Sequence, residues 1–242
     1  MNLVKIFVYQ SAVCQYGRSG KRLSSELFSQ NERLMSQYFS VHSETPQKRL
    51  IQQAADIILQ GGVAVYPTDS GYAIGCRIGD KAAMERICRI RNIDKDHNFT
   101  LMCRDLSELS TFARVDNQAF RLLKNNTPGP YTFILKGTKE VPKRLLNPKR
   151  KTIGIRVSDD PIVVALLEAL AEPLMSTSLI LDDNDFAESD PHEIRDRLER
   201  QVDLIIDGDH RGEEQTTVID LADDVVRIAR EGAGDISPFV DD

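Results

Sequence analysis

The stretch from Gly61 to Tyr72 limits the fold more than any other part of the chain. Two glycines, Gly61 and Gly62, predict the end of an amphipathic helix, because glycine adopts the left-handed helix end without a Cβ clash. A short apolar strand follows over 63–66, and Pro67 predicts its end because proline cannot donate to a ladder. An ordinary strand and polar turn would fit this pattern. In open α/β sheets, however, ligands bind at such strand ends. The side chains presented there are Thr68, Asp69, Ser70 and Tyr72.

Length and composition exclude several classes of protein. The 242 residues are 41% hydrophobic, enough to bury one sizeable core, and the net charge of -6 gives no overall attraction to nucleic acid or anionic lipid. Four cysteines without a C-x-x-C pair indicate reduced thiols, and the four scattered histidines lack metal-ligand spacing. The sequence shows no membrane-spanning run. We therefore expect a cytoplasmic protein with no metal site of its own and no membrane partner.

The hydrophobic pattern predicts one α/β domain over residues 35–242, with residues 1–34 as a dispensable N-terminal extension. The segment that begins at Met35 is expected to lead directly into the first helix. Many strands with helices between them favour a twisted mixed sheet with flanking helices. Helices are expected near 46–60, 80–91, 106–112, 118–124, 160–170 and 191–200, and strands near 63–66, 73–78, 99–103, 131–136, 152–157, 173–180, 202–207, 216–221 and 225–230.

Two basic clusters each allow two interpretations. Arg89 and Arg91 lie in the last turn of the second predicted helix, and Asn98 follows shortly after. Arginines there complement the helix dipole, but guanidinium groups also match phosphate geometry. A second basic run surrounds Pro142 and Pro148. It is typical of a solvated surface, and it also suits a lip that attracts polyphosphate or RNA. This run contains Lys143, Arg144, Lys149, Arg150 and Lys151.

Seven short motifs occur in a fixed order along the chain. They are Pro67-Thr68-Asp69-Ser70-Gly71-Tyr72, Arg89-x-Arg91, Pro128-Gly129-Pro130-Tyr131-Thr132, Gly154-Ile155-Arg156-Val157, Ser176-Thr177-Ser178, Thr216-Thr217-Val218-Ile219-Asp220 and Arg230-x-Gly232. Each motif alone is weakly specific, but the ordered series resembles the YrdC/YciO family, and most closely its YciO branch. The resemblance extends from about residue 35 to residue 240.

The resemblance implies a twisted sheet around a large concave basic cavity. The best-known activity of the family is synthesis of threonylcarbamoyl-AMP from L-threonine, bicarbonate and ATP, on the route to a modified tRNA adenosine. Double-stranded RNA or tRNA binding is also attributed to the cavity. By this resemblance, Mg²⁺ would arrive with ATP, held mostly by ATP and water. The implied threonine-site residues are Thr68, Arg156 and Thr216, with Tyr72 and Thr132 lining the cavity. The implied nucleotide contacts are Arg89, Arg91, Asn98, Ser176, Ser178 and Arg230, of which Arg89, Arg91, Ser176 and Ser178 form the catalytic set.

The chain departs from the family pattern at three places. Arg89-x-Arg91 stands where the family usually has Lys-x-Arg, and Ser176-x-Ser178 stands where it has Ser-x-Asn. Asp69-Ser70-Gly71-Tyr72 replaces Glu-Thr-Val-Tyr. Loss of an ammonium group and of an amide donor predicts slower adenylate formation. Two functions therefore stay open: a threonylcarbamoyl-AMP synthase, which is a nucleotidyltransferase, and a non-catalytic protein that binds RNA or a nucleotide.

Overall fold

The computed structural model describes residues 35–94, 97–181, 186–212, 214–223 and 225–240. The chain divides into two units, residues 1–33 and 34–242, and every described residue belongs to the second unit. The prediction that residues 1–34 are a dispensable extension lies outside the described residues.

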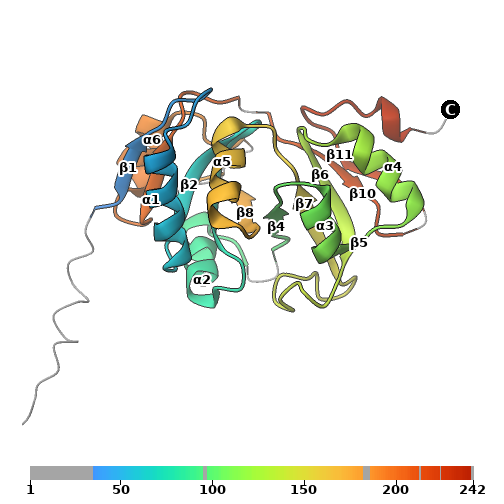
Figure 1. Ribbon diagram of the computed structural model, residues 1–242. Helices are drawn as coiled ribbons and strands as arrows, with labels where there is room; N and C mark the ends of the chain where they lie inside the picture. Colours follow the sequence, from blue (N-terminus) through green and yellow to red (C-terminus); the bar gives the residue numbers. More distant parts are fainter. Residues whose placement is uncertain (1–34, 95–96, 182–185, 213, 224, 241–242) are drawn as a thin grey trace, which may run out of the picture. The chain divides into compact units, whose positions relative to one another are not determined.

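The described strands form one mixed sheet with flanking helices, which confirms the predicted fold class (Figure 1). The pairs β1–β9, β9–β2, β4–β7 and β6–β10 are parallel, and the other pairs are antiparallel. The order across the sheet is β1 (Gln37–Ser40), β9 (Leu204–Asp207), β2 (Ala64–Thr68), β3 (Gly71–Arg77), β8 (Leu174–Ser178), β4 (Thr100–Met102), β7 (Thr152–Arg156), β6 (Tyr131–Gly137), β10 (Thr217–Asp220) and β11 (Arg227–Arg230), with β5 (Ala113–Arg114) paired to β6 off this path.

All six predicted helices are present, and aspartate begins five of them. Each of these aspartates accepts a hydrogen bond from a backbone N–H of the first turn, which satisfies a donor that the helix itself leaves unpaired. The N-terminal aspartates are Asp80, Asp105, Asp116, Asp160 and Asp190. The helices are α1 (Lys48–Leu59), α2 (Lys81–Arg91), α3 (Leu106–Phe112), α4 (Asn117–Asn126), α5 (Pro161–Leu170) and α6 (Pro191–Leu198), and a short 3-10 helix, η1 (Ser237–Phe239), follows β11.

The predicted glycine end of the first helix is confirmed. Gly61 has a φ of +91°, and its N–H donates to the carbonyl oxygen of Ile58, while Gly62 donates to Ile57.

None of the helices in the described ranges combines the length and the apolar character that a membrane span requires.

The sheet separates two clusters of buried apolar side chains. Successive side chains of a strand point to opposite faces, and in β2 Ala64 and Tyr66 join one cluster while Val65 joins the other. The smaller cluster contains the inner sides of α1 and α5, which lie next to each other in Figure 1. The larger cluster contains side chains from α2, α3, α4 and α6.

Strand β2 continues through Pro67 to Thr68, so the prediction that Pro67 ends the strand is wrong. Pro67 lies opposite Tyr72 of β3. The Tyr72 N–H donates to Glu188 and its carbonyl accepts from Leu179, so both groups point away from β2. Pro67 therefore occupies a non-hydrogen-bonded position, where its missing N–H costs no ladder bond.

Two short strands also differ from the sequence prediction. The segment after Met35 was expected to lead directly into the first helix, but Gln37–Ser40 form β1, parallel to β9. Ala113–Arg114 form β5, antiparallel to β6, between α3 and α4. Strand β1 does not alternate strictly between buried and exposed residues, and β5 is only two residues long. Neither segment is long or regular enough to leave a periodic pattern.

Gly75 of β3 allows β8 to approach closely, which makes it a test of the fold. A Cβ atom at Gly75 would lie 2.6 Å from the carbonyl oxygen of Met175, a backbone atom that cannot rotate away. We expect Gly75→Ala to lower the free energy of unfolding by about 1–3 kcal/mol, as measured by urea denaturation. Gly212→Ala is the matched control, because nothing lies within 4 Å of its added Cβ. Equal stability of the two variants would contradict this close packing.

Candidate functional site

A row of small side chains leaves a cavity of about 350 Å³ over one face of the sheet. Residues directly opposite each other on neighbouring strands share a face. Ser178 lies opposite Ala73, Ser176 lies opposite Thr100, and Thr100 lies opposite Gly154. A Cβ at Gly154 would already come within 3.0 Å of Thr100 Oγ1. The volume falls in the usual range for small-molecule sites, about 300–1,000 Å³.

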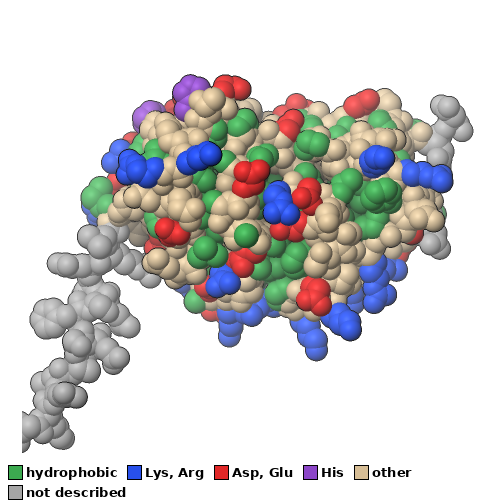
Figure 2. Space-filling model, viewed as in Figure 1, with side chains coloured by type: hydrophobic (Ala, Val, Ile, Leu, Met, Phe, Trp, Pro, Cys, Tyr) green, Lys and Arg blue, Asp and Glu red, His purple; other side chains and the backbone are tan. Residues whose placement is uncertain are grey.

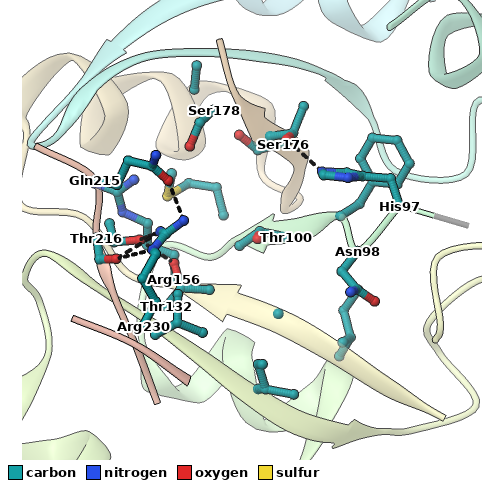
Figure 3. A pocket seen from close by; sticks show the side chains of 18 of the residues that line it. His97, Asn98, Thr100, Thr132, Arg156, Ser176, Ser178, Gln215, Thr216 and Arg230 are labelled. Carbon is teal, nitrogen blue, oxygen red and sulfur yellow. Dashed lines mark hydrogen bonds between the residues drawn. The ribbon is translucent and has the colours of Figure 1, made fainter. Parts of the chain in front are cut away.

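Most predicted site residues meet at this cavity. Figure 3 shows Ser176 and Ser178 on one wall, the side chains around Arg156 and Arg230 at one end, and His97 and Asn98 at the other. The predicted residues that line the cavity are Thr68, Tyr72, Arg91, Asn98, Thr132, Arg156, Ser176, Ser178, Thr216 and Arg230.

Arg89 does not join them. It is exposed on the outer side of α2 and lines a separate hollow with Glu85 and Asn92. Helix α2 continues to Arg91, and residues two apart on a helix point in nearly opposite directions. Because Arg91 points to the cavity, Arg89 points away from it, so the structure does not place Arg89 with the predicted phosphate-binding residues.

Arg156 lies almost fully buried at the end of β7, next to Thr68 of β2. Its Nη2 atom lies 2.6 Å from Asp69 Oδ1 and 3.5 Å from Thr68 Oγ1. The Thr68 hydroxyl donates to the carbonyl of Gly71 at 2.7 Å, which fixes the turn between β2 and β3. Arg156 Nε is buried without a hydrogen-bond partner among the described residues. Arg156 also lines the cavity, and its hydrogen-bonding capacity is not fully used by the described residues.

Arg230 is held by the strand beside it. Its Nε and Nη2 atoms donate to the carbonyl oxygen of Thr216 at 3.1 and 2.8 Å, and Nη1 donates to Gln215 Oε1 (Figure 3). The Thr216 hydroxyl lies 2.9 Å from the Thr132 hydroxyl on β6. The segment just before β10 thus connects a cation and two hydroxyl groups at one end of the cavity.

Ser176 and its neighbours place hydroxyl groups along β8. The buried Tyr66 hydroxyl donates to Ser176 Oγ at 2.6 Å, and burial raises the pKa of Tyr66 to about 12, so this phenol stays protonated. Thr177 Oγ1 lies 3.2 Å from His97 Nε2. Tyr72 is committed elsewhere, because its hydroxyl donates to the carbonyl of Asp209 at 2.9 Å.

The connection between β6 and β7 forms one rim of the cavity through Leu145, Asn147 and Arg150. Asn147 donates to Asn98 Oδ1 at 3.1 Å, which holds the predicted nucleotide-binding residue Asn98. Arg150 forms ion pairs with Asp220 at 2.5 Å and Asp223 at 2.9 Å, so its charge is balanced locally. Lys and Arg side chains gather along the lower edge in Figure 2, where Figure 1 places α2 and this connection.

The cavity favours an anionic ligand. Within the described ranges, Arg91 and Arg230 contact only neutral oxygens: the Ile180 carbonyl for Arg91, and Thr216 and Gln215 for Arg230. Burial lowers the pKa of both guanidinium groups, and the charge of Arg156 lowers that of Arg230 further. An anion would compensate these buried charges.

No group of three or more His, Cys, Asp or Glu residues suited to a metal ion occurs in the described part of the chain.

Sequence reasoning did not select several residues of the site. Gln215 and Thr100 line the cavity, and Asp69, which the sequence placed at the strand end without a role of its own, contacts Arg156. Asp69 lies within the strand-end motif identified from the sequence, so its position could have indicated a role at the site. Gln215 precedes β10 and contacts Arg230 of β11, and the pairing of these two strands is not evident from the pattern of either segment.

His97 provides a titration test of the site. Burial, and secondly the charge of Arg91, lower the pKa of His97 below its usual value of 6.5. Between the folded-state pKa and pH 6.5, the folded protein therefore binds fewer protons at His97 than the unfolded chain does. The neutral form of His97 thus favours the folded state above pH 6.5, and this stabilisation is lost as the pH falls through the folded-state pKa. We expect Arg91→Ala to raise the His97 pKa, as measured by NMR, and Arg89→Ala to leave it unchanged. Equal titration in both variants would contradict the contact with Arg91.

Comparison with known proteins identifies the family. Residues 56–232 match the family model of Sua5, YciO and YrdC, described as "Telomere recombination". The chain is 68% identical to YciO of Escherichia coli (strain K12) over 206 residues, which are 85% of this chain and 100% of that protein. The crystal structure of E. coli YciO superimposes with a TM-score of 0.83 at 67% identity and the same coverage.

More distant relatives carry names that state an activity or a ligand. The chain is 28% identical to threonylcarbamoyl-AMP synthase of Vibrio vulnificus (strain YJ016) over 162 residues, 66% of this chain and 86% of that protein. It shares the fold of P. abyssi Sua5 complexed with L-threonine, with a TM-score of 0.75 at 24% identity, covering 81% of this chain and 58% of that one. The recognition made from the motifs is confirmed, and the chain belongs to the Sua5/YciO/YrdC family.

Proposed function

We propose that this cavity binds L-threonine and ATP and forms threonylcarbamoyl-AMP, with bicarbonate as the carbon source. The observation that carries the proposal is the convergence of Arg91, Arg156 and Arg230 with strand hydroxyl groups on one cavity. The name of the V. vulnificus relative and the L-threonine bound to P. abyssi Sua5 support the choice of reaction and amino acid. The product would serve modification of a tRNA adenosine.

The reaction suits such a cavity because it requires positioning and positive charge. The threonine amine attacks bicarbonate to give a carbamate and water. A carbamate oxygen then attacks the α-phosphorus of ATP, and pyrophosphate leaves. Phosphoryl transfer of this kind is accelerated by aligned reactants and by cations that stabilise the developing charge, without a protein nucleophile.

The cavity offers separate places for the two reactants. We assign the threonine carboxylate to Arg156, beside Thr68 and Thr216, because Arg156 Nε lacks a partner among the described residues. We assign the phosphates to Arg91, Ser176 and Ser178, which line the same cavity. Asn98 and Arg230 would contact the nucleotide, and Tyr72 and Thr132 shape the walls. The lining supplies hydroxyl, amide and guanidinium groups, so Mg²⁺ enters as part of the Mg·ATP substrate, bound by phosphates and water.

Two features favour slow turnover. Arg89 points away from the cavity, so Arg91 is the only member of the Arg89-x-Arg91 pair that faces the phosphates. Ser178 replaces the amide of the Ser-x-Asn pattern and offers a single hydroxyl donor. Each lost charge-assisted contact weakens a transition state by about 1.5–3 kcal/mol, or roughly ten- to a hundredfold in rate.

The direct test is to incubate the protein with L-threonine, bicarbonate and Mg·ATP and to detect the adenylate by mass spectrometry. We expect threonylcarbamoyl-AMP to accumulate, and omission of threonine to abolish it. The basic edge in Figure 2 supports the second candidate, a non-catalytic RNA- or nucleotide-binding protein. Nucleotide binding in the cavity without any adenylate would favour that candidate and contradict the synthase proposal.

Arg91 and Arg89 form a matched pair for locating the phosphate site. We expect Arg91→Ala to weaken Mg·ATP binding by about 1–3 kcal/mol, the range for one charge-assisted contact. Arg89→Ala is the control, because it removes the same charge from the same helix but outside the cavity. Isothermal titration calorimetry measures both dissociation constants. Equal losses in the two variants would mean that general electrostatic attraction, and not a contact in the cavity, binds ATP.

A further inference from the structure

Asp69 lies next to the cavity but is not one of its lining residues. Its neighbours Thr68 and Ser70 line the cavity, and the Asp69 side chain is 12% exposed. Asp69 Oδ1 accepts hydrogen bonds from Arg156 Nη2 at 2.6 Å and from the Ser158 hydroxyl. The carboxylate therefore contacts Arg156, which lines the cavity, without lining the cavity itself.

A second layer fixes Asp69 in turn. The Ser158 hydroxyl that contacts Asp69 also accepts the backbone N–H of Asp160 at 3.2 Å. Asp160 begins α5 by accepting from two backbone N–H groups, and its Oδ2 lies 3.0 Å from Nη2 of Arg211, on the connection between β9 and β10. The support of Arg156 thus includes the β2–β3 turn, the start of α5 and a segment from a distant part of the chain.

The contact between Asp69 and Arg156 uses only part of each group. A carboxylate and a guanidinium commonly form two parallel hydrogen bonds, but here Asp69 Oδ2 and Arg156 Nε are both buried without a hydrogen-bond partner among the described residues. A pair selected for stability alone would use these atoms, since a buried unpaired polar atom costs free energy. The contact with Asp69 engages only Nη2, so the other donors of Arg156, which lines the cavity, have no carboxylate partner among the described residues.

We propose that Asp69 is a positioning residue, which holds the Arg156 guanidinium so that its remaining donors meet the carboxylate of the bound amino acid. The identification of that ligand as L-threonine rests on the proposed function. The orientation of Arg156 by Asp69 does not, because it is a property of the protein without ligand.

The substitution Asp69→Asn separates positioning from simple charge balance. Removing a negative charge next to Arg156 leaves that cation less neutralised, so electrostatics alone predicts tighter binding of a carboxylate. Loss of orientation predicts weaker binding. The two explanations thus differ in the sign of the effect. In metal sites, loss of an outer partner costs about ten- to a hundredfold in affinity, and we expect about tenfold weaker L-threonine binding here.

Two measurements on the full chain test the proposal. Calorimetry gives the dissociation constants of L-threonine and of Mg·ATP. Nitrogen-15 NMR of arginine side chains reports whether the Arg156 guanidinium is held or rotates freely, with the Arg156 signals assigned by their loss in Arg156→Lys. Asp203→Asn is the matched control, because it breaks another partly buried ion pair, with Arg86 at 2.5 Å, that lies outside the cavity lining.

We expect Asp69→Asn to weaken L-threonine binding, to leave Mg·ATP binding within about twofold of the parent, and to free the Arg156 guanidinium, whereas Asp203→Asn changes none of these. Tighter threonine binding, or an Arg156 guanidinium that stays fixed, would overturn the proposal. If the parent does not bind L-threonine, the proposed function fails, and the NMR result still decides the role of Asp69. If Asp69→Asn does not fold, Ser158→Ala replaces it, with a smaller effect of the same sign expected.

Discussion

The cross-strand register of β3, β8, β4 and β7 is the constraint on which the cavity depends. Because side chains alternate along each strand, the same register that aligns Ser176, Thr100 and Gly154 on one face directs Met175, Leu101 and Ile155 into the larger cluster on the other. A shift of β8 by one residue would bring Met175 into the cavity and bury a serine in the core. The space for a ligand and the packing beneath it are therefore specified together.

The positions of the charged side chains at the site depend on this sheet register. Arg156 on β7 and Arg230 on β11 reach the same end of the cavity, and Arg91 reaches the cavity from the end of α2. Backbone carbonyls at Ile180 and Thr216 hold two of the three guanidinium groups. A carbonyl orients a guanidinium without neutralising it, so the full charge remains for a ligand. Asp69 is the exception, and its contact is limited to one nitrogen atom.

Local patterns in the sequence were sufficient for most of the fold. Aspartate before each of five helices, glycine after the first, and apolar runs for the central strands each have a local physical cause. The residues of the cavity came from the ordered motifs. The prediction failed where a partner far away in the chain decides the outcome. Pro67 is tolerated because its position opposite Tyr72 is not hydrogen-bonded and the pairing with β9 ends at Val65, and β1 exists because β9 pairs with it. Arg89 lies outside the cavity lining because residues two apart on a helix do not share a face, so Arg89 and Arg91 point apart.

The strand order also has a consequence for how the chain folds during its synthesis. Strands β3 and β4 are neighbours of β8 and not of each other, so the floor of the cavity is incomplete until residue 178 has emerged from the ribosome. Strand β1 stays unpaired even longer, because its partner β9 (Leu204–Asp207) is synthesised late, with only β10 and β11 after it. At about 5–20 residues per second, the edges of β2, β3 and β4 stay unpaired for several seconds. This interval exposes the nascent protein to edge-to-edge association until β8 and β9 pair with these strands.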